Sequence, residues 1–100
     1  KTVLITGAAG GIGTYLCSHF AETAGTVILV DINEQALADA KKRLSKYPAK
    51  LVSYTVDQGD KKAVDKMAAD VLKKYGCPDI LINNAGIGLH AEMENTSMDK

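Results

Sequence analysis

Thr6-Gly7-Ala8-Ala9-Gly10-Gly11-Ile12-Gly13 is the stretch that decides the fold. It joins a short β-branched run, Thr2–Thr6, to a segment with helical periodicity. Glycines in this position let the chain turn sharply, let backbone N–H groups approach a diphosphate, and let the helix pack closely on the strand. The N-terminus of the helix adds unpaired N–H donors and a partial positive charge. The context predicts a dinucleotide-binding turn, with a tight βα turn that binds nothing as the alternative.

The rest of the chain alternates strands with helices. Short apolar runs without clean alternation suit strands that are buried on both faces, as in a parallel sheet. Strands linked through helices predict a doubly wound α/β sheet with right-handed crossovers. We expect strands at residues 2–6, 26–30, 51–56 and 80–82, and helices within residues 12–24, 33–47 and 60–75.

Each expected helix has an apolar stripe and an end signal. In the first, Ile12, Leu16, Phe20 and Ala24 recur every four residues before Gly25, which predicts that they face the core. In the second, Asn33 is a plausible N-cap, and Leu37, Ala40, Leu44 and Tyr47 form the apolar face before Pro48. In the third, the face is Val64, Met67, Ala68, Val71 and Tyr75, with Gly76 beyond its end.

Composition excludes several classes of protein. The 100 residues carry 12 basic and 12 acidic side chains, so the formal net charge is zero. A binder of nucleic acid or anionic membrane that relies on bulk charge needs uncompensated basic residues, so we expect neither partner. The longest strongly apolar run, residues 27–30, is too short to span a bilayer. Cys17 and Cys77 form no C-x-x-C motif, which favours two free thiols in a reducing compartment and no metal site.

Asp31 is the second candidate binding residue. It ends the second strand, close to the offset of about 20 residues at which a carboxylate binds the adenosine ribose in dinucleotide folds. The same carboxylate repels a 2′-phosphate, and the next residues, Ile32 and Asn33, offer no cation. The pattern predicts NAD as the cofactor rather than NADP. The alternative role for Asp31 is only to cap the following helix.

With these residues in place, the sequence resembles the short-chain dehydrogenase/reductase family. The Thr-Gly-x-x-x-Gly-x-Gly tract at residues 6–13 matches the cofactor loop of that family, and Asn-Asn-Ala-Gly at 83–86 matches its signature after the fourth strand. Asp57, after the third strand, matches the acid that contacts the adenine amino group. The resemblance covers essentially the whole chain, as the N-terminal cofactor-binding half. It implies a Rossmann-type sheet in the order 3-2-1-4 with helices on both faces.

The resemblance also assigns residues. Thr6 would hold the loop against the Asn-Asn-Ala-Gly turn, Asn83 would be structural, and Asp57 with the backbone of Gln58 would bind the adenine edge. Two departures weaken the start of the third helix: Gln58 replaces a common aliphatic residue, and Gly59 replaces a common Ser or Thr cap. The implied cofactor-binding residues are Gly7, Gly10, Gly11, Ile12, Gly13, Asp31, Asp57, Gln58, Asn84 and Ala85.

The catalytic residues of the family are absent from these 100 residues. Family members use a Ser and a Tyr-x-x-x-Lys pair, but the positions four after Tyr15, Tyr47, Tyr54 and Tyr75 hold no lysine. The resemblance places that pair beyond residue 100, so no catalytic residue is assigned here. His90 is a loop histidine that could reach a substrate pocket.

The expected protein is therefore an NAD-dependent oxidoreductase acting on a small alcohol or carbonyl compound. We expect residues 1–100 to be a truncated dinucleotide-binding half of one domain, in a cytoplasmic protein that forms a dimer or tetramer. Two alternatives remain. One is a non-catalytic NAD(P)-binding regulatory protein on the same scaffold. The other, less favoured, is a relative of sugar-nucleotide epimerases, which typically have a different glycine spacing.

Overall fold

A computed structural model describes residues 1–84 of the chain. Within them, strands and helices alternate strictly along the sequence. The elements are β1 (Thr2–Thr6), α1 (Gly11–Ala21), β2 (Thr26–Asp31), α2 (Glu34–Leu44), β3 (Lys50–Thr55), α3 (Lys61–Tyr75) and β4 (Ile80–Asn83). The strand predictions are confirmed to within one residue at each end. The first two helices end earlier than expected.

The four strands form one parallel sheet in the order β3-β2-β1-β4, as expected. In the register, Thr6 lies opposite Val30 on one side and opposite Asn83 on the other. Strand β1 is therefore central, and the chain leaves it in opposite directions toward β2 and β4. Such a reversal of strand order opens a crevice at the carboxyl ends of the strands.

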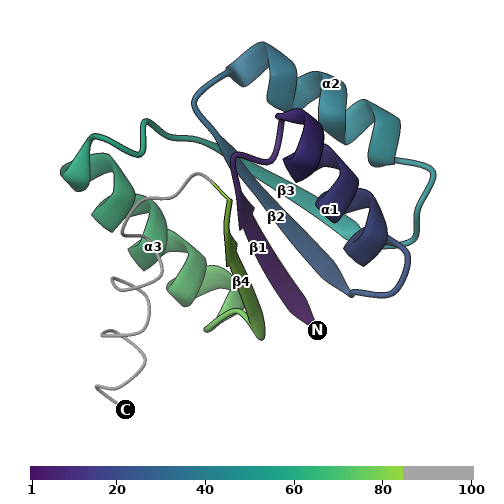
Figure 1. Ribbon diagram of the computed structural model, residues 1–100. Helices are drawn as coiled ribbons and strands as arrows, with labels where there is room; N and C mark the ends of the chain where they lie inside the picture. The colour runs from purple at the N-terminus through teal and green to yellow at the C-terminus, as the bar shows by residue number, and fades with distance from the viewer. Residues whose placement is uncertain (85–100) are drawn as a thin grey trace.

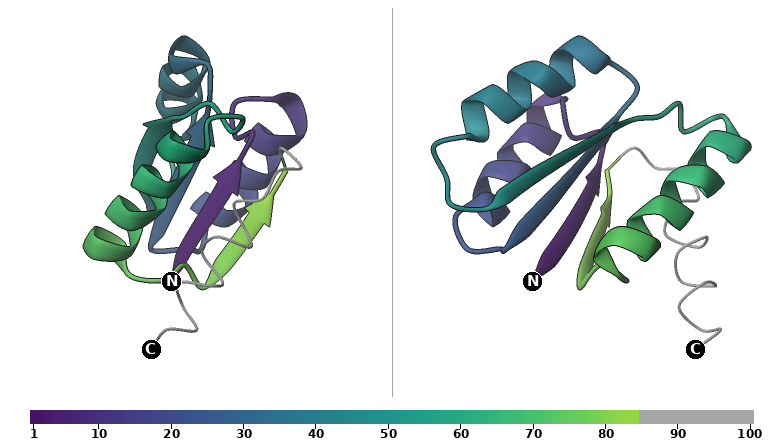
Figure 2. Two further views of the ribbon diagram at one scale, coloured as in Figure 1. Left: turned by 90° about the vertical axis from the view of Figure 1, so that its left-hand side faces the viewer. Right: turned by 180° about the vertical axis from the view of Figure 1, so that it is seen from behind.

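Helices cover both faces of the sheet, with α1 and α2 on one side and α3 on the other (Figure 1). The turned views show the same layers (Figure 2). Alternate side chains of β1 point to opposite faces of the sheet. Val3 and Ile5 pack in the core beneath α1 and α2, whereas Leu4 packs in the core beneath α3. All three are fully buried. This arrangement explains why the strands are continuously apolar.

The core face of α1 differs from the predicted one. Ile12 is 71% exposed, and the buried residues of the helix are Gly13, Cys17 and Ala21. Leu16 and Phe20 only flank this core. The buried row is shifted by one position because it carries the smaller side chains, which bring the helix axis close to the sheet. The helix ends at Ala21, four residues before Gly25.

The caps of α2 and α3 come from side chains. Asn33 caps α2 as predicted, since its Oδ1 accepts the N–H of Ala36 at 3.0 Å. Asp60 caps α3, where its Oδ1 accepts the N–H of Ala63 at 3.2 Å. Asp60 thus supplies the cap that position 59 lacks. At the other end, Gly76 adopts a φ of 78° just beyond the helix.

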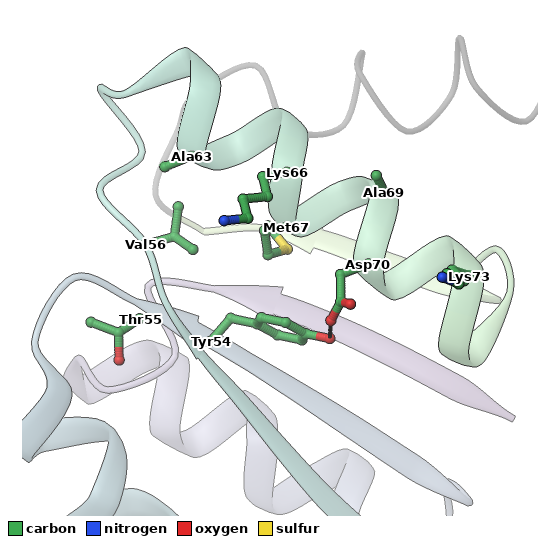
Figure 3. Close-up of a pocket in the computed structure, with 9 residues that line it drawn as sticks. All are labelled: Tyr54, Thr55, Val56, Ala63, Lys66, Met67, Ala69, Asp70 and Lys73. Atoms are coloured by element: carbon green, nitrogen blue, oxygen red, sulfur yellow. Dashed lines mark hydrogen bonds between the residues drawn. The ribbon is translucent and has the colours of Figure 1, made fainter.

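A polar contact joins β3 to α3 inside a hollow of about 500 Å³, on the face of the sheet that α3 covers (Figure 3). The hydroxyl of Tyr54 donates to Oδ2 of Asp70 at 2.5 Å, and Lys74 pairs with the same carboxylate at 3.4 Å. These two contacts, the hydrogen bond first, lower the pKa of Asp70. Burial and the neighbouring carboxylate raise the pKa of Tyr54.

The pKa directions predict how Tyr54→Phe alters stability with pH. Because the pKa of Asp70 is lower in the folded protein, its ionisation stabilises the fold above about pH 3.9, the pKa of an unfolded Asp. Because the pKa of Tyr54 is higher in the folded protein, its ionisation destabilises the fold above about pH 10. We expect Tyr54→Phe to lower the melting temperature of the full-length protein by a few degrees near neutral pH. The difference from wild type should shrink below about pH 4 and above about pH 10. Thermal unfolding across the pH range measures it.

The control for this experiment is Tyr47→Phe, which deletes the same atom on the opposite face. Within residues 1–84 the Tyr47 hydroxyl has no hydrogen bond, and its ring lies beside Lys46, with Nζ 5.3 Å from the ring centroid. Its effect should not change between pH 3 and neutral pH. A Tyr54→Phe effect that is equally large at pH 3 would contradict the assignment.

Candidate functional site

The predicted site residues meet at the carboxyl edge of the sheet. Gly7 follows β1, Asp31 ends β2, Asp57 follows β3, and Asn84 follows β4. Because the strands are parallel and adjacent, these four positions share one edge. Hydrogen bonds join neighbouring segments at this edge.

The glycine-rich loop is a compact turn. Gly7 has a φ of 63°, in the left-handed region that favours glycine. The N–H of Gly10 donates back to the carbonyl of Gly7 at 3.2 Å, and the N–H of Ala8 donates to the carbonyl of Val30 at 3.1 Å. The hydroxyl of Thr14 donates to the carbonyl of Ala8 at 3.1 Å. The loop is thus held from both β2 and α1.

Two glycines of the loop have opposite surroundings. A Cβ on Gly13 would lie 2.0 Å from the carbonyl oxygen of Gly7 and 2.8 Å from its carbon, so no side chain fits there. A Cβ on Gly11 would meet no atom within 4 Å. Gly13 therefore permits α1 to pack against the loop, whereas the space at Gly11 is open.

The open space lies at the N-terminus of α1. The first helical N–H with a partner is that of Thr14, which donates to the carbonyl of Gly10 at 2.8 Å. The N–H groups of Gly11, Ile12 and Gly13 precede it in the first turn and have no partner within the helix. No acidic residue lies in this turn. The end of α1 therefore keeps its donors and partial positive charge for an anion.

Asp31 is half-buried and touches two elements. Its Oδ2 accepts the N–H of Ala9 in the glycine-rich loop at 3.0 Å, and its Oδ1 accepts the N–H of Asn33 at 3.1 Å. The side chain that caps α2 is that of Asn33, so Asp31 is not merely a helix cap. The Ala9 contact was not predicted from sequence, because it joins residues that lie far apart along the chain.

The segment after β4 contacts the same loop. The hydroxyl of Thr6 donates to Oδ1 of Asn83 at 3.0 Å, which matches the role expected for Thr6. The side-chain amide of Asn84 donates to the carbonyl of Gly7 at 3.4 Å. Thr6 is fully buried, so Asn83 gives a buried hydroxyl its partner. Ala85 and His90 lie outside the described residues.

Asp57 and Gln58 form the turn after β3. Asp57 is exposed, and its Oδ1 accepts the N–H of Gly59 at 2.8 Å. The amide nitrogen and oxygen of Gln58 are both buried and have no hydrogen-bond partner in the described part of the chain. An unsatisfied buried amide is costly, and it marks the point where the sequence departs from the family pattern.

Two hollows flank this edge. The one between β3 and α3 (Figure 3) contains none of the predicted cofactor residues. The other, about 460 Å³, lies between α1 and the end of α2 and reaches the loop at Ala9, Gly10 and Gly11. Arg43 and Lys46 line its far side. No local sequence pattern relates these cations to the loop, because they lie on the next helix and the turn after it.

Other candidate chemistry is sparse in residues 1–84. No group of three metal-ligating side chains occurs among them, and none of their helices is long and apolar enough to cross a membrane. Both cysteines are free thiols. Burial raises the pKa of Cys17 to about 12, so this thiol is protonated and unreactive at neutral pH.

Comparisons with known proteins agree with this geometry. The family model for short chain dehydrogenases matches residues 1–100. The 3beta-hydroxysteroid dehydrogenase 2 of Eggerthella lenta is 38% identical over 87 residues, which are 87% of this chain and 34% of the relative.

Solved structures show the same likeness. L-sorbose reductase from Gluconobacter frateurii, complexed with NADPH and L-sorbose, superposes with a TM-score of 0.78 at 32% identity, over 88% of this chain and 34% of that one. An NAD⁺-bound xylitol dehydrogenase gives a TM-score of 0.76 at 31% identity, over 81% of this chain and 31% of that one.

The chain thus spans about a third of the length of these relatives. The match of the family model over all 100 residues, together with the strand order and the glycine-rich loop, shows that the chain belongs to the short-chain dehydrogenase family.

Proposed function

We propose that the chain supplies the cofactor site of an NAD-dependent oxidoreductase that transfers hydride between the nicotinamide and a small alcohol or carbonyl substrate. The observation that carries the proposal is the glycine-rich loop: a Cβ on Gly11 would meet no atom within 4 Å at the start of α1, and Ala9 of the same loop donates to Asp31. A diphosphate fits donors of this kind, and adenosine ribose hydroxyls fit a carboxylate.

The residues present suit a dinucleotide. Gly7, Gly10, Gly11, Ile12 and Gly13 would hold its diphosphate and adjoining ribose, while Asn84 and Ala85 would lie beside the cofactor. Asp57 and the backbone of Gln58 would bind the adenine. When bound, the nicotinamide supplies hydride chemistry. The chain's own residues bind and orient the cofactor, and the proton-transfer residues are proposed to lie beyond residue 100.

The preference for NAD rests on Asp31. Its oxygens each accept one backbone N–H, and an ionised carboxylate has about four acceptor positions, so it can still accept ribose hydroxyls. A 2′-phosphate about 4 Å away would meet a repulsion of about 4 kcal/mol per unit charge. The exposed side chains of Ile32 and Asn33 offer no compensating cation. The relatives include NADPH and NAD⁺ complexes, so family membership alone favours neither cofactor.

A non-catalytic regulatory protein that binds NAD(P) on this scaffold is the second candidate. Such a protein would keep the glycine-rich loop and Asp31 but would have no Tyr-x-x-x-Lys pair anywhere in its full length. Turnover of any alcohol by the full-length protein, purified free of host enzymes, separates the two. Binding without turnover across a broad panel of alcohols and ketones would favour the regulatory role.

Cofactor choice is the first prediction about this site. Calorimetric titration of the full-length protein should give a lower Kd for NADH than for NADPH, by about 100-fold or more, because of the charge on Asp31. The double variant Asp31→Ala/Ile32→Arg should narrow or reverse the ratio. Equal or tighter binding of NADPH by the wild type would contradict the proposal.

Gly11 and Gly13 provide a matched pair for a second prediction. In Gly11→Val the new Cβ would meet no atom within 4 Å, so the fold should survive. NADH affinity should fall at least about 10-fold, because the phosphates lose that space. In Gly13→Val the side chain collides with Gly7, so the thermal transition itself should drop or disappear. Circular dichroism and NADH titration measure the two effects.

The two variants separate binding from folding. A folded Gly11→Val protein that retains wild-type NADH affinity would refute the diphosphate site. A Gly13→Val protein as stable as wild type would refute the close packing of α1 on the loop.

A further inference from the structure

The glycine-rich loop is attached to β2 by two successive N–H groups. Ala8 donates to the carbonyl of Val30 at 3.1 Å, and Ala9 donates to Oδ2 of Asp31 at 3.0 Å. The first bond joins main-chain groups and survives any substitution at Val30. The second depends on a side chain. One carboxylate therefore determines whether the middle of the loop is anchored.

The same carboxylate is itself held in place. Its Oδ1 accepts the N–H of Asn33 at 3.1 Å, and the Oδ1 of Asn33 accepts the N–H of Ala36 in the first turn of α2 at 3.0 Å. The main chain of Asp31 is fixed as well, since its carbonyl accepts the N–H of Val56 at 2.9 Å. Hydrogen bonds to an ionised acceptor are stronger than neutral ones. Asp31 is thus a rigid anchor between α2 and the loop.

The anchor affects which donors face a ligand. With its N–H directed at Asp31, Ala9 is not a donor for a diphosphate, and the unpaired donors are those of Gly11, Ile12 and Gly13 at the start of α1. The short turn from Gly7 to Gly10 leads directly into that helix end. Without the bond from Ala9, the loop gains freedom that a bound ligand would have to remove.

We propose that Asp31 is a positioning residue for the diphosphate loop, acting through the N–H of Ala9, in addition to any contact with the adenosine ribose. The inference rests on the proposed function, because it assumes that the loop binds a diphosphate. On this proposal Asp31 determines the affinity for the diphosphate of the cofactor, which its side chain does not contact. Substitution of Asp31 then loosens the loop for both dinucleotides, in addition to its effect on the ribose or the 2′-phosphate.

Inorganic pyrophosphate tests this inference because it has no ribose. Electrostatics and positioning predict opposite changes in pyrophosphate affinity when Asp31 is replaced. Removing a negative charge near the diphosphate raises the affinity, whereas loss of the anchor lowers it. We expect Asp31→Ala in the full-length protein to bind pyrophosphate about five-fold more weakly than wild type. Asp31→Asn keeps one acceptor oxygen for two N–H donors, so its pyrophosphate affinity should lie between those of wild type and Asp31→Ala.

The matched control is Asp39→Asn, which removes one negative charge from α2. The Asp39 carboxylate is exposed and accepts a hydrogen bond from the side-chain amide of Gln35 at 3.2 Å. The pyrophosphate affinity of Asp39→Asn should equal or slightly exceed that of wild type. Amide hydrogen exchange of Ala9, followed by NMR without ligand, should be faster in both Asp31 variants and unchanged in Asp39→Asn.

The outcomes distinguish this inference from the proposed function. If Asp31→Ala binds NADH more weakly but pyrophosphate as well as or better than wild type, Asp31 acts on the ribose alone and the inference is overturned. Unchanged exchange of Ala9 in a folded Asp31→Asn protein overturns it too. If the wild type binds neither NADH nor pyrophosphate, the proposed function fails, while Ala9 exchange still reports on the anchor.

Discussion

The pairing of β1 with β2 on one side and β4 on the other is the constraint on which the rest of the structure depends. Parallel pairing brings the carboxyl ends of the strands to one edge, so the glycine-rich loop, Asp31 and Asn84 meet there although they are far apart in sequence. It also buries both faces of the sheet, with α1 and α2 on one and α3 on the other (Figure 2). The site exists because this order places a turn at the point where the connections diverge.

Close approach is the second physical requirement. The carbonyl of Gly7 occupies the space that a side chain at position 13 would need, so α1 can start next to the loop only if that position is glycine. The same closeness selects small residues, Cys17 and Ala21, for the buried row of the helix. Larger residues such as Ile12 are left outside, in the exposed first turn of α1.

The edge of the sheet is also a hydrogen-bonded unit. Thr6 donates to Asn83, Asn84 donates to Gly7, and Ala9 donates to Asp31, so the carboxyl ends of β2 and β4 hold the loop that follows β1. A loop held from several sides loses less conformational freedom when a ligand binds. This explains how a short glycine-rich turn can keep one shape despite the flexibility of its residues.

The sequence alone predicted the alternation of elements and the strand bounds to within a residue, because these depend on local composition and on the order of elements along the chain. The glycine-rich loop and Asp31 were found from their spacing, whereas Asp57 and Asn84 were named only by the resemblance to a family. Only the tertiary structure decided which of two adjacent rows of α1 faces the sheet. Rows starting at Ile12 and at Gly13 have the same helical period, and the choice between them depends on how closely the helix packs. The hydrogen bond from Ala9 to Asp31 could not be predicted from the sequence either, since no local pattern relates a loop N–H to a carboxylate on the neighbouring strand.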